Sequence, residues 1–223
     1  MLMKKRKNMM RSFIYIFLTA YSLMTLFPFL WSLMTSFKTT REITSTMTFF
    51  PQEWSFGGYE IIFDSQFPIW VKNSLVIAMI VTFLNLLFNT LAGYALARIP
   101  FKGRNFLFNA LLILIMIPSQ VTMIPLYIVI ARMGLVNTHM ALIVTSMINI
   151  TYIFMMRQFF MHFPREVEEA AAIDGLSRFG TFFRIVLPNM KASIATQCVF
   201  VFMAVWNEFM RPLLFISSTE KYM

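Results

Sequence analysis

Five long apolar stretches constrain this chain more than any other feature of its sequence. A helix needs roughly 20 residues, at 1.5 Å each, to cross about 30 Å of hydrocarbon. The stretches of about that length are residues 12–37, 73–97, 105–130, 139–156 and 190–210. Because a backbone in lipid must satisfy its own hydrogen bonds, we predict an all-α fold, a polytopic membrane helical bundle with five spans in one domain, residues 1–223.

The few charged residues and the positive net charge of the chain are both typical of a membrane protein. Charged residues make up 13% of the sequence, against about 25% in soluble domains. The formal net charge of +9 could suggest nucleic acid, but membrane proteins retain Lys and Arg at cytoplasmic helix ends. We therefore expect the lipid bilayer as partner and no nucleic acid.

The distribution of Lys and Arg predicts the orientation. With the N-terminus in the cytoplasm, 13 of the 19 basic residues lie inside and six outside, which agrees with the positive-inside rule. The inner segments are 1–11, 98–104 and 157–191, and the outer segments are 38–72, 131–139 and 211–223. The basic segment 1–11 is thus cytoplasmic, and 38–72 is an external cap with interfacial aromatics.

Polar residues within the spans are candidates for a transport pathway or gate. Asn85 and Asn89 lie one helical turn apart in the second span, where they either form interhelical hydrogen bonds or face the path of a solute. Asn207 and Glu208 lie at the outer end of the fifth span. Ionisable groups in membranes usually face protein or water, so Glu208 either lines a pathway or pairs with Arg211.

The sequence predicts no enzyme active site, metal site or bound cofactor. Its single cysteine, Cys198, and its two histidines, His139 and His162, lie far apart in sequence. Gly175 and Gly180 have the GxxxxG spacing, but the Lys and Ser/Thr of a phosphate-binding loop do not follow them.

The inner segment 157–189 has a distinctive helix pattern. Residues 164–174 begin with a proline and three glutamates and continue with alanines, which predicts a short helix that ends at Gly175. Ser177 can cap a second helix. Its predicted apolar stripe, which anchors it against the membrane domain, comprises Phe179, Phe182, Phe183 and Val186. Such a segment is either a docking lever for a partner or an amphipathic loop at the membrane interface.

The same segment resembles the EAA motif of permease subunits in binding-protein-dependent ABC importers. The matching residues are Glu169, Ala170, Ala171, Gly175, Ile185, Leu187 and Pro188. The resemblance extends over nearly the whole chain and is strongest to the carbohydrate-uptake branch, similar to the shorter maltose permease subunit. Supporting stretches are Asn73-Ser-Leu, Ala95-Leu-Ala-Arg98, Ile117-Pro-Ser-Gln, Gly134-Leu-Val-Asn137 and Trp206-Asn-Glu-Phe209.

This resemblance implies a permease for a sugar or oligosaccharide in a bacterial or archaeal cell membrane. Glu169, Ala170, Ala171 and Gly175 would belong to a coupling helix that docks on an ATPase; Glu166, Glu168 and Asp174 are added on charge alone. The implied partners are a second permease subunit, an ABC ATPase dimer that holds ATP and Mg, and an extracytoplasmic solute-binding protein. Transport would proceed by alternating access.

Two other functions stay open, an ion-driven secondary carrier and a membrane anchor or sensor subunit without a pathway. The family usually has six core spans with both ends in the cytoplasm, so we expect the sequence to stop before a closing span.

Overall fold

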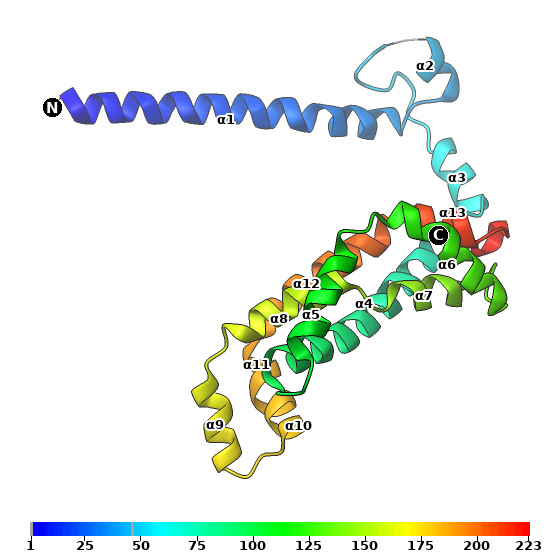
Figure 1. Ribbon diagram of the computed structural model, residues 1–223. Coiled ribbons are helices and arrows are strands. Elements are labelled where there is room, and N and C mark those ends of the chain that lie inside the picture. Colours follow the sequence, from blue (N-terminus) through cyan, green and yellow to red (C-terminus); the bar gives the residue numbers. More distant parts are fainter. Residues whose placement is uncertain (1, 46) are drawn as a thin grey trace. The chain divides into compact units, whose positions relative to one another are not determined.

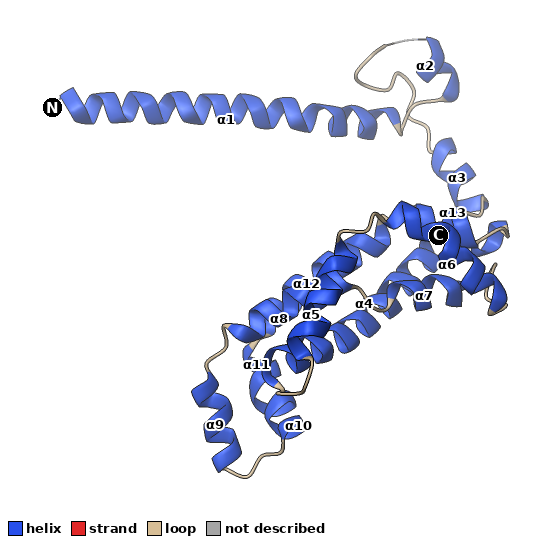
Figure 2. Ribbon diagram, in the orientation of Figure 1, coloured by secondary structure: helices blue, strands red, loops and turns tan. Residues whose placement is uncertain are grey.

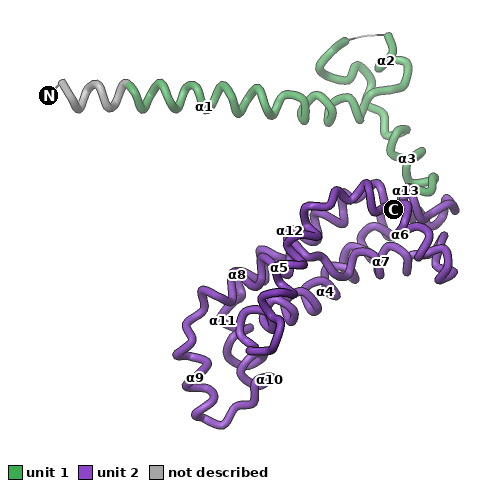
Figure 3. The backbone as a smooth tube through the Cα atoms, in the orientation of Figure 1, with its two compact units in different colours: residues 1–68 green, residues 69–223 purple. Residues whose placement is uncertain are grey.

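The computed structural model describes the backbone of residues 2–45 and 47–223 and the side chains of residues 10–45 and 47–223. The side chains of most of the predicted basic segment 1–11 therefore lie outside the described part. Every regular element in residues 2–45 and 47–223 is helical (Figure 2). The chain, which the sequence predicts to be one domain, forms two compact units, residues 1–68 and 69–223 (Figure 3).

Unit 1 consists of a long helix and a small folded cap. Its helices are α1 (Leu2–Thr35), α2 (Thr40–Ser45) and α3 (Gly57–Asp64) (Figure 1). In the cap, the Phe37 ring packs against Trp54, Phe56 and Tyr59 with centroids 5.6 to 5.7 Å apart. The predicted external segment is therefore ordered by aromatic packing as well as by short helices.

Unit 2 is a helical bundle. Its elements are α4 (Phe67–Arg98, in this unit from Ile69), α5 (Arg104–Ile115), α6 (Ser119–Arg132), α7 (His139–Ser146), α8 (Ile150–Met161), α9 (Arg165–Ile173), α10 (Arg178–Thr181), a π-helical turn (Phe182–Val186), α11 (Leu187–Asn189), α12 (Lys191–Trp206), α13 (Met210–Phe215) and a 3₁₀ turn (Thr219–Lys221). Within this unit, α9 and α10 lie at one end and α6 and α13 at the other (Figure 1).

The helices confirm a polytopic bundle and correct the shape of two spans. Three described segments, Met10–Thr35, Phe67–Arg98 and His139–Met161, are long and apolar enough to cross a membrane, and five are if each bent helix pair is one span. The predicted span 105–130 bends by 103° between α5 and α6. Pro118 lies at this bend; it lacks an N–H group, and it disfavours helical backbone in the residue before it.

The predicted fifth span is also bent. The helical segment Arg178–Asn189 meets α12 at an angle of 79°, and α12 ends at Trp206, short of the predicted 210. The bend falls at Met190, and Leu187 and Pro188 lie before it, inside α11. Proline is tolerated there because the first turn of a helix needs no N–H donor.

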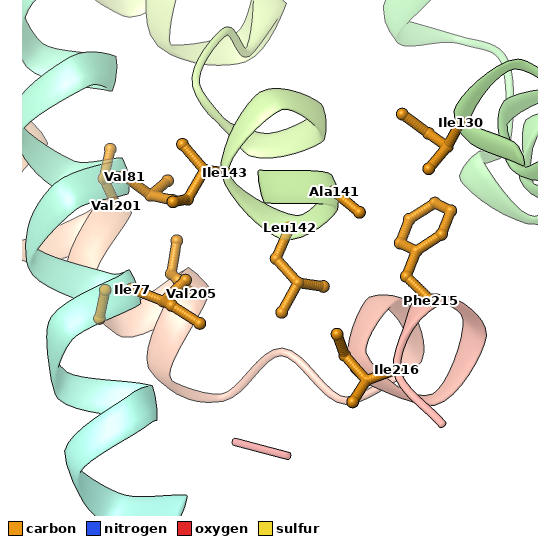
Figure 4. Close-up of a cluster of buried hydrophobic side chains, with 11 residues drawn as sticks. Ile77, Val81, Ile130, Ala141, Leu142, Ile143, Val201, Val205, Phe215 and Ile216 are labelled. Carbon is orange, nitrogen blue, oxygen red and sulfur yellow. The ribbon is translucent and has the colours of Figure 1, made fainter. Parts of the chain in front are cut away.

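Buried apolar side chains join the long helices. Figure 4 shows Ile77 and Val81 of α4, Ala141 to Ile143 of α7, Val201 and Val205 of α12, and Phe215 of α13 in one cluster. Nearer to α9, Gly93 lets α4 approach α8 closely. A Cβ atom at this position would lie 2.7 Å from the Cβ atom of Met156, so no larger residue fits without a shift of the helices.

Candidate functional site

The short helix α9 has well-defined ends. It begins after Pro164, and Glu166 and Glu168 lie in its first turn, where carboxylates interact favourably with the helix dipole. At its other end Gly175 has a φ of 80°, as the sequence predicts. The Gly175 N–H donates to Ala172 O at 3.1 Å and the Leu176 N–H to Ala171 O at 3.0 Å. These two bonds form a Schellman motif.

The sides of α9 differ in exposure. Ala171 is buried and Glu168 is half-buried. Glu166, Glu169, Ala170 and Ile173 are all exposed, and their i, i+3, i+4, i+7 spacing places them on one side of the helix. We call these four residues the outer face of α9. Ile173 is 87% exposed, so this face presents a large apolar side chain beside two carboxylates.

The inner side of α9 is tied to the end of α4. The Nε atom of Arg98 lies 3.1 Å from Oε1 of Glu168, and only 6% of the Arg98 side chain is exposed. Arg98 also donates a hydrogen bond to Phe163 O, in the turn before α9. The Tyr94 hydroxyl donates to Glu168 Oε2 at 3.4 Å. Movement of α9 is therefore linked to the end of α4.

The segment after α9 follows the prediction in its cap but not in its stripe. Ser177 Oγ accepts a hydrogen bond from the Gly180 N–H at 3.2 Å, as a helix cap does. Phe182 and Val186 are buried, but Phe179 is 73% exposed and Phe183 48%. Because the chain forms a π-helical turn from Phe182, residues at α-helical spacing no longer share one face. Only half of the predicted stripe anchors the segment.

The remaining motif residues lie along the bend that leads into α12. Ile185 and Leu187 are half-buried, and Pro188 is exposed. Asp174 is exposed at the end of α9, where its N–H donates to Ala170 O at 3.0 Å.

Asn85 and Asn89 meet a break between α7 and α8. Asn85 Nδ2 donates to Ser146 O at 3.2 Å, and the Asn149 N–H donates to Asn89 Oδ1 at 3.3 Å. Asn89 also donates to Asn85 Oδ1, which accepts a further bond from Gln197 Nε2 of α12 at 3.3 Å. Both asparagines are at most 1% exposed, and they satisfy backbone groups that the break would otherwise leave unpaired.

Glu208 lies in the turn between α12 and α13. Its Oε2 atom forms an ion pair with Arg211 Nη1 at 3.2 Å, and its Oε1 atom accepts from the Met210 N–H at 3.0 Å. Arg211 Nη1 also donates to Ser146 Oγ at 3.0 Å. Asn207 is exposed and donates to Met203 O at 2.8 Å. Asn85 and Asn89 thus contact the break after Ser146 directly and Glu208 reaches it through Arg211, whereas Asn207 bonds to α12.

The sequence reasoning missed three residues that complete these sites. Arg98 appeared only as the first residue of an inner segment and in the stretch Ala95-Leu-Ala-Arg98, and nothing in the sequence names Glu168 as its partner. Gln197 is fully buried within α12, where a polar residue in an apolar run was the available signal. Ile173 follows the alanines of α9, and its exposure depends on which side of the helix faces the bundle.

Comparisons with known proteins identify the family of this chain. Residues 89–220 match the family described as "Binding-protein-dependent transport system inner membrane component". The arabinooligosaccharides transport system permease protein AraQ of Halalkalibacterium halodurans is 35% identical over 88% of this chain and 72% of its own. The inner membrane ABC transporter permease protein YcjP of Escherichia coli is 34% identical over 97% of this chain and 80% of its own.

The fold is also found in a solved structure. A crystal structure of a bacterial ABC transporter involved in the import of the acidic polysaccharide alginate contains a chain that superposes with a TM-score of 0.88. The match covers 96% of this chain and 76% of that one, at 20% sequence identity. On the family match and the two relatives, this chain belongs to the inner membrane components of binding-protein-dependent transport systems.

Proposed function

We propose that this chain is a permease subunit of an ATP-driven importer for a sugar or oligosaccharide, and that α9 docks on a separate ATPase. The supporting observation is the exposed outer face of α9 on a helix whose inner side is tied to α4. A short helix with one exposed face, and with its opposite side bonded to α4, can transmit the movement of a partner to the membrane spans. The substrate class is supported by AraQ, which is named for arabinooligosaccharides.

This proposal includes the placement and the partners. The end of unit 2 that carries α9 faces the cytoplasm, in accordance with the positive-inside count, and the N-terminus lies on the same side. The complete transporter contains a second permease subunit, two ATPase subunits that hold ATP and Mg, and an extracytoplasmic solute-binding protein. Its location is the cell membrane of a bacterium or archaeon.

The outer face of α9 gives a sharp test. Ile173 is a large exposed apolar side chain at the C-terminal end of this face, and such anchors dominate binding energy at interfaces. We expect Ile173→Ser to lower the recovery of the ATPase with tagged permease about tenfold. Met133→Ser, an exposed apolar position directly after α6, is the matched control and should leave recovery unchanged.

Uptake measurements separate this function from its alternatives. Cells that carry the complete transporter should take up a labelled oligosaccharide, and depletion of ATP with the ion gradients intact should stop uptake. Uptake that follows an ion gradient and persists without ATP would identify a secondary carrier. Normal ATPase recovery with no solute flux through the reconstituted complex would indicate an anchor or sensor subunit.

A further inference from the structure

A basic cavity lies between α9 and the bundle. Its volume is about 470 Å³, and it is bounded by the end of α4, the start of α5, α9 and α10. Four arginines line it: Arg98, Arg104, Arg165 and Arg178. Its acidic lining residues are Glu168 and Glu169. The cavity therefore brings together positive charges from four different helices, and Glu169 is the one residue that it shares with the outer face of α9.

These charges are only partly neutralised within the chain. Arg98 is paired with Glu168 at 3.1 Å. The side chains of Arg104, Arg165 and Arg178 form no hydrogen bond or ion pair with any residue that the structure describes. Three guanidinium groups thus share the cavity with one further carboxylate, that of Glu169. The balance favours an anion, and arginine binds phosphate oxygens through two parallel N–H donors.

Two smaller apolar cavities adjoin the basic cavity, and we call them together the apolar groove. A second cavity of about 250 Å³ shares Tyr94, Ile99 and Arg178 with it. A third, of about 200 Å³, shares Leu91 and Phe182 with the second. The remaining apolar side chains that line these two cavities are Phe83, Leu86, Leu87, Ala95, Phe179, Phe183, Leu187 and Ile194.

The groove is long enough for a lipid tail. It follows the chain from Phe83 to Ile99, which at 1.5 Å per residue is about 24 Å. One leaflet contributes about half of the 30 Å hydrocarbon core. Phe179 and Phe183 project along its edge with large exposed surfaces. A soluble anion would occupy only the basic cavity, so the adjoining apolar groove favours a ligand with both a charged and an apolar part.

We propose that an anionic phospholipid binds here, with its phosphate among Arg104, Arg165 and Arg178 and one acyl chain along α4. Basic pockets between helices on the cytoplasmic side are the sites that hold anionic headgroups in membrane proteins. The phosphate bridges α9 to the start of α5, so the lipid stiffens the connection that α9 makes with the bundle. This effect rests on the proposed coupling role of α9, whereas the binding itself does not.

Lipid binding can be measured on the complete transporter. The complex is purified through a tag on this chain, mixed with equal amounts of phosphatidylglycerol and phosphatidylcholine, and examined by native mass spectrometry. We expect phosphatidylglycerol to be retained preferentially. The Arg104→Gln/Arg178→Gln double variant should lower its retention about tenfold. Arg184→Gln is the matched control, because Arg184 is exposed on the neighbouring π-helical turn and lines none of these three cavities.

A second variant tests the tail and excludes a soluble ligand. Leu91→Trp fills the groove and should also release phosphatidylglycerol, although it leaves every arginine in place. Millimolar inorganic phosphate should fail to displace the lipid from the wild type. Displacement by inorganic phosphate together with unchanged binding in Leu91→Trp would mean a soluble anion, and would overturn the proposal.

Two further outcomes would overturn it without a variant. Equal retention of the two lipids by the wild type would show that the arginines do not select an anionic headgroup. Retention of neither lipid would mean that another part of the transporter fills the groove. In each case uptake of the sugar would continue, so a failure of this inference is distinguishable from a failure of the proposed function.

Discussion

Arg98, the last residue of α4, forms an ion pair of 3.1 Å with Glu168, in the first turn of α9. This contact joins the longest helix of unit 2 to the helix that we propose to dock on the ATPase. Both side chains are largely buried, so neither charge is well hydrated. The pair is therefore a direct link between the proposed docking helix and a membrane span.

Removal of both charges from this pair should destabilise the protein by less than the sum of the two single removals. Glu168→Gln leaves Arg98 buried without its counter-ion and should destabilise the protein by about 2 kcal/mol, because an unpaired buried charge is expensive. Arg98→Gln/Glu168→Gln should cost less than the two single changes together. The measurement is a double-mutant cycle of denaturant unfolding in detergent.

Glu166→Gln is the matched control for this cycle, because Glu166 is exposed in the same helical turn. It should change the free energy of unfolding by no more than about 0.5 kcal/mol. Strictly additive single and double variants would show that Arg98 and Glu168 do not interact.

The close approach of α4 and α8 at Gly93 predicts a large effect of one methyl group. Gly93→Ala would place its Cβ atom 2.7 Å from the Cβ atom of Met156 and 2.9 Å from the Arg157 N atom. Overpacking of this kind costs about 1–3 kcal/mol. Gly58→Ala, with its nearest neighbour at 4.0 Å, should be neutral or slightly stabilising in a thermal unfolding assay. Equal melting temperatures for both variants would contradict this packing.

The polar contacts at the α7–α8 break predict opposite effects for two neighbouring residues. Asn85→Leu removes hydrogen bonds to Ser146, Asn89 and Gln197 and should cost about 2 kcal/mol. Thr82→Val removes a buried hydroxyl that has no partner in the described chain, and should be neutral or stabilising. Unfolding in mixed detergent micelles measures both. A greater loss of unfolding free energy for Thr82→Val than for Asn85→Leu would refute the hydrogen-bond network.

The left-handed backbone at the end of α9 predicts a graded series. Gly175 has a φ of 80°, which costs most residues with a Cβ atom about 1–2 kcal/mol, and asparagine less. Gly175→Ala should speed hydrogen exchange at the amides of residues 175 and 176, which close the helix end, and Gly175→Asn should do so less. A Cβ atom meets nothing within 4 Å there, so the series isolates backbone strain from packing. Identical exchange in all three proteins would exclude that strain.

The sequence alone determined the class of the protein, because its signals are local and periodic. Apolar stretches near the thickness of a membrane predicted the spans, and the proline, glutamates and glycine around α9 predicted a short helix that ends at Gly175. The spacing of that motif was enough for the family. None of these signals depends on what another part of the chain does.

The tertiary structure decided which residues meet. Arg98 pairs with Glu168, and Gln197 with Asn85, through contacts between segments far apart in sequence. The π-helical turn at Phe182 changed the register of the predicted stripe, and the bends next to Pro118 and at Met190 divided two spans. Such features depend on the packing of several helices at once, and a pattern along one helix carries no record of its neighbours.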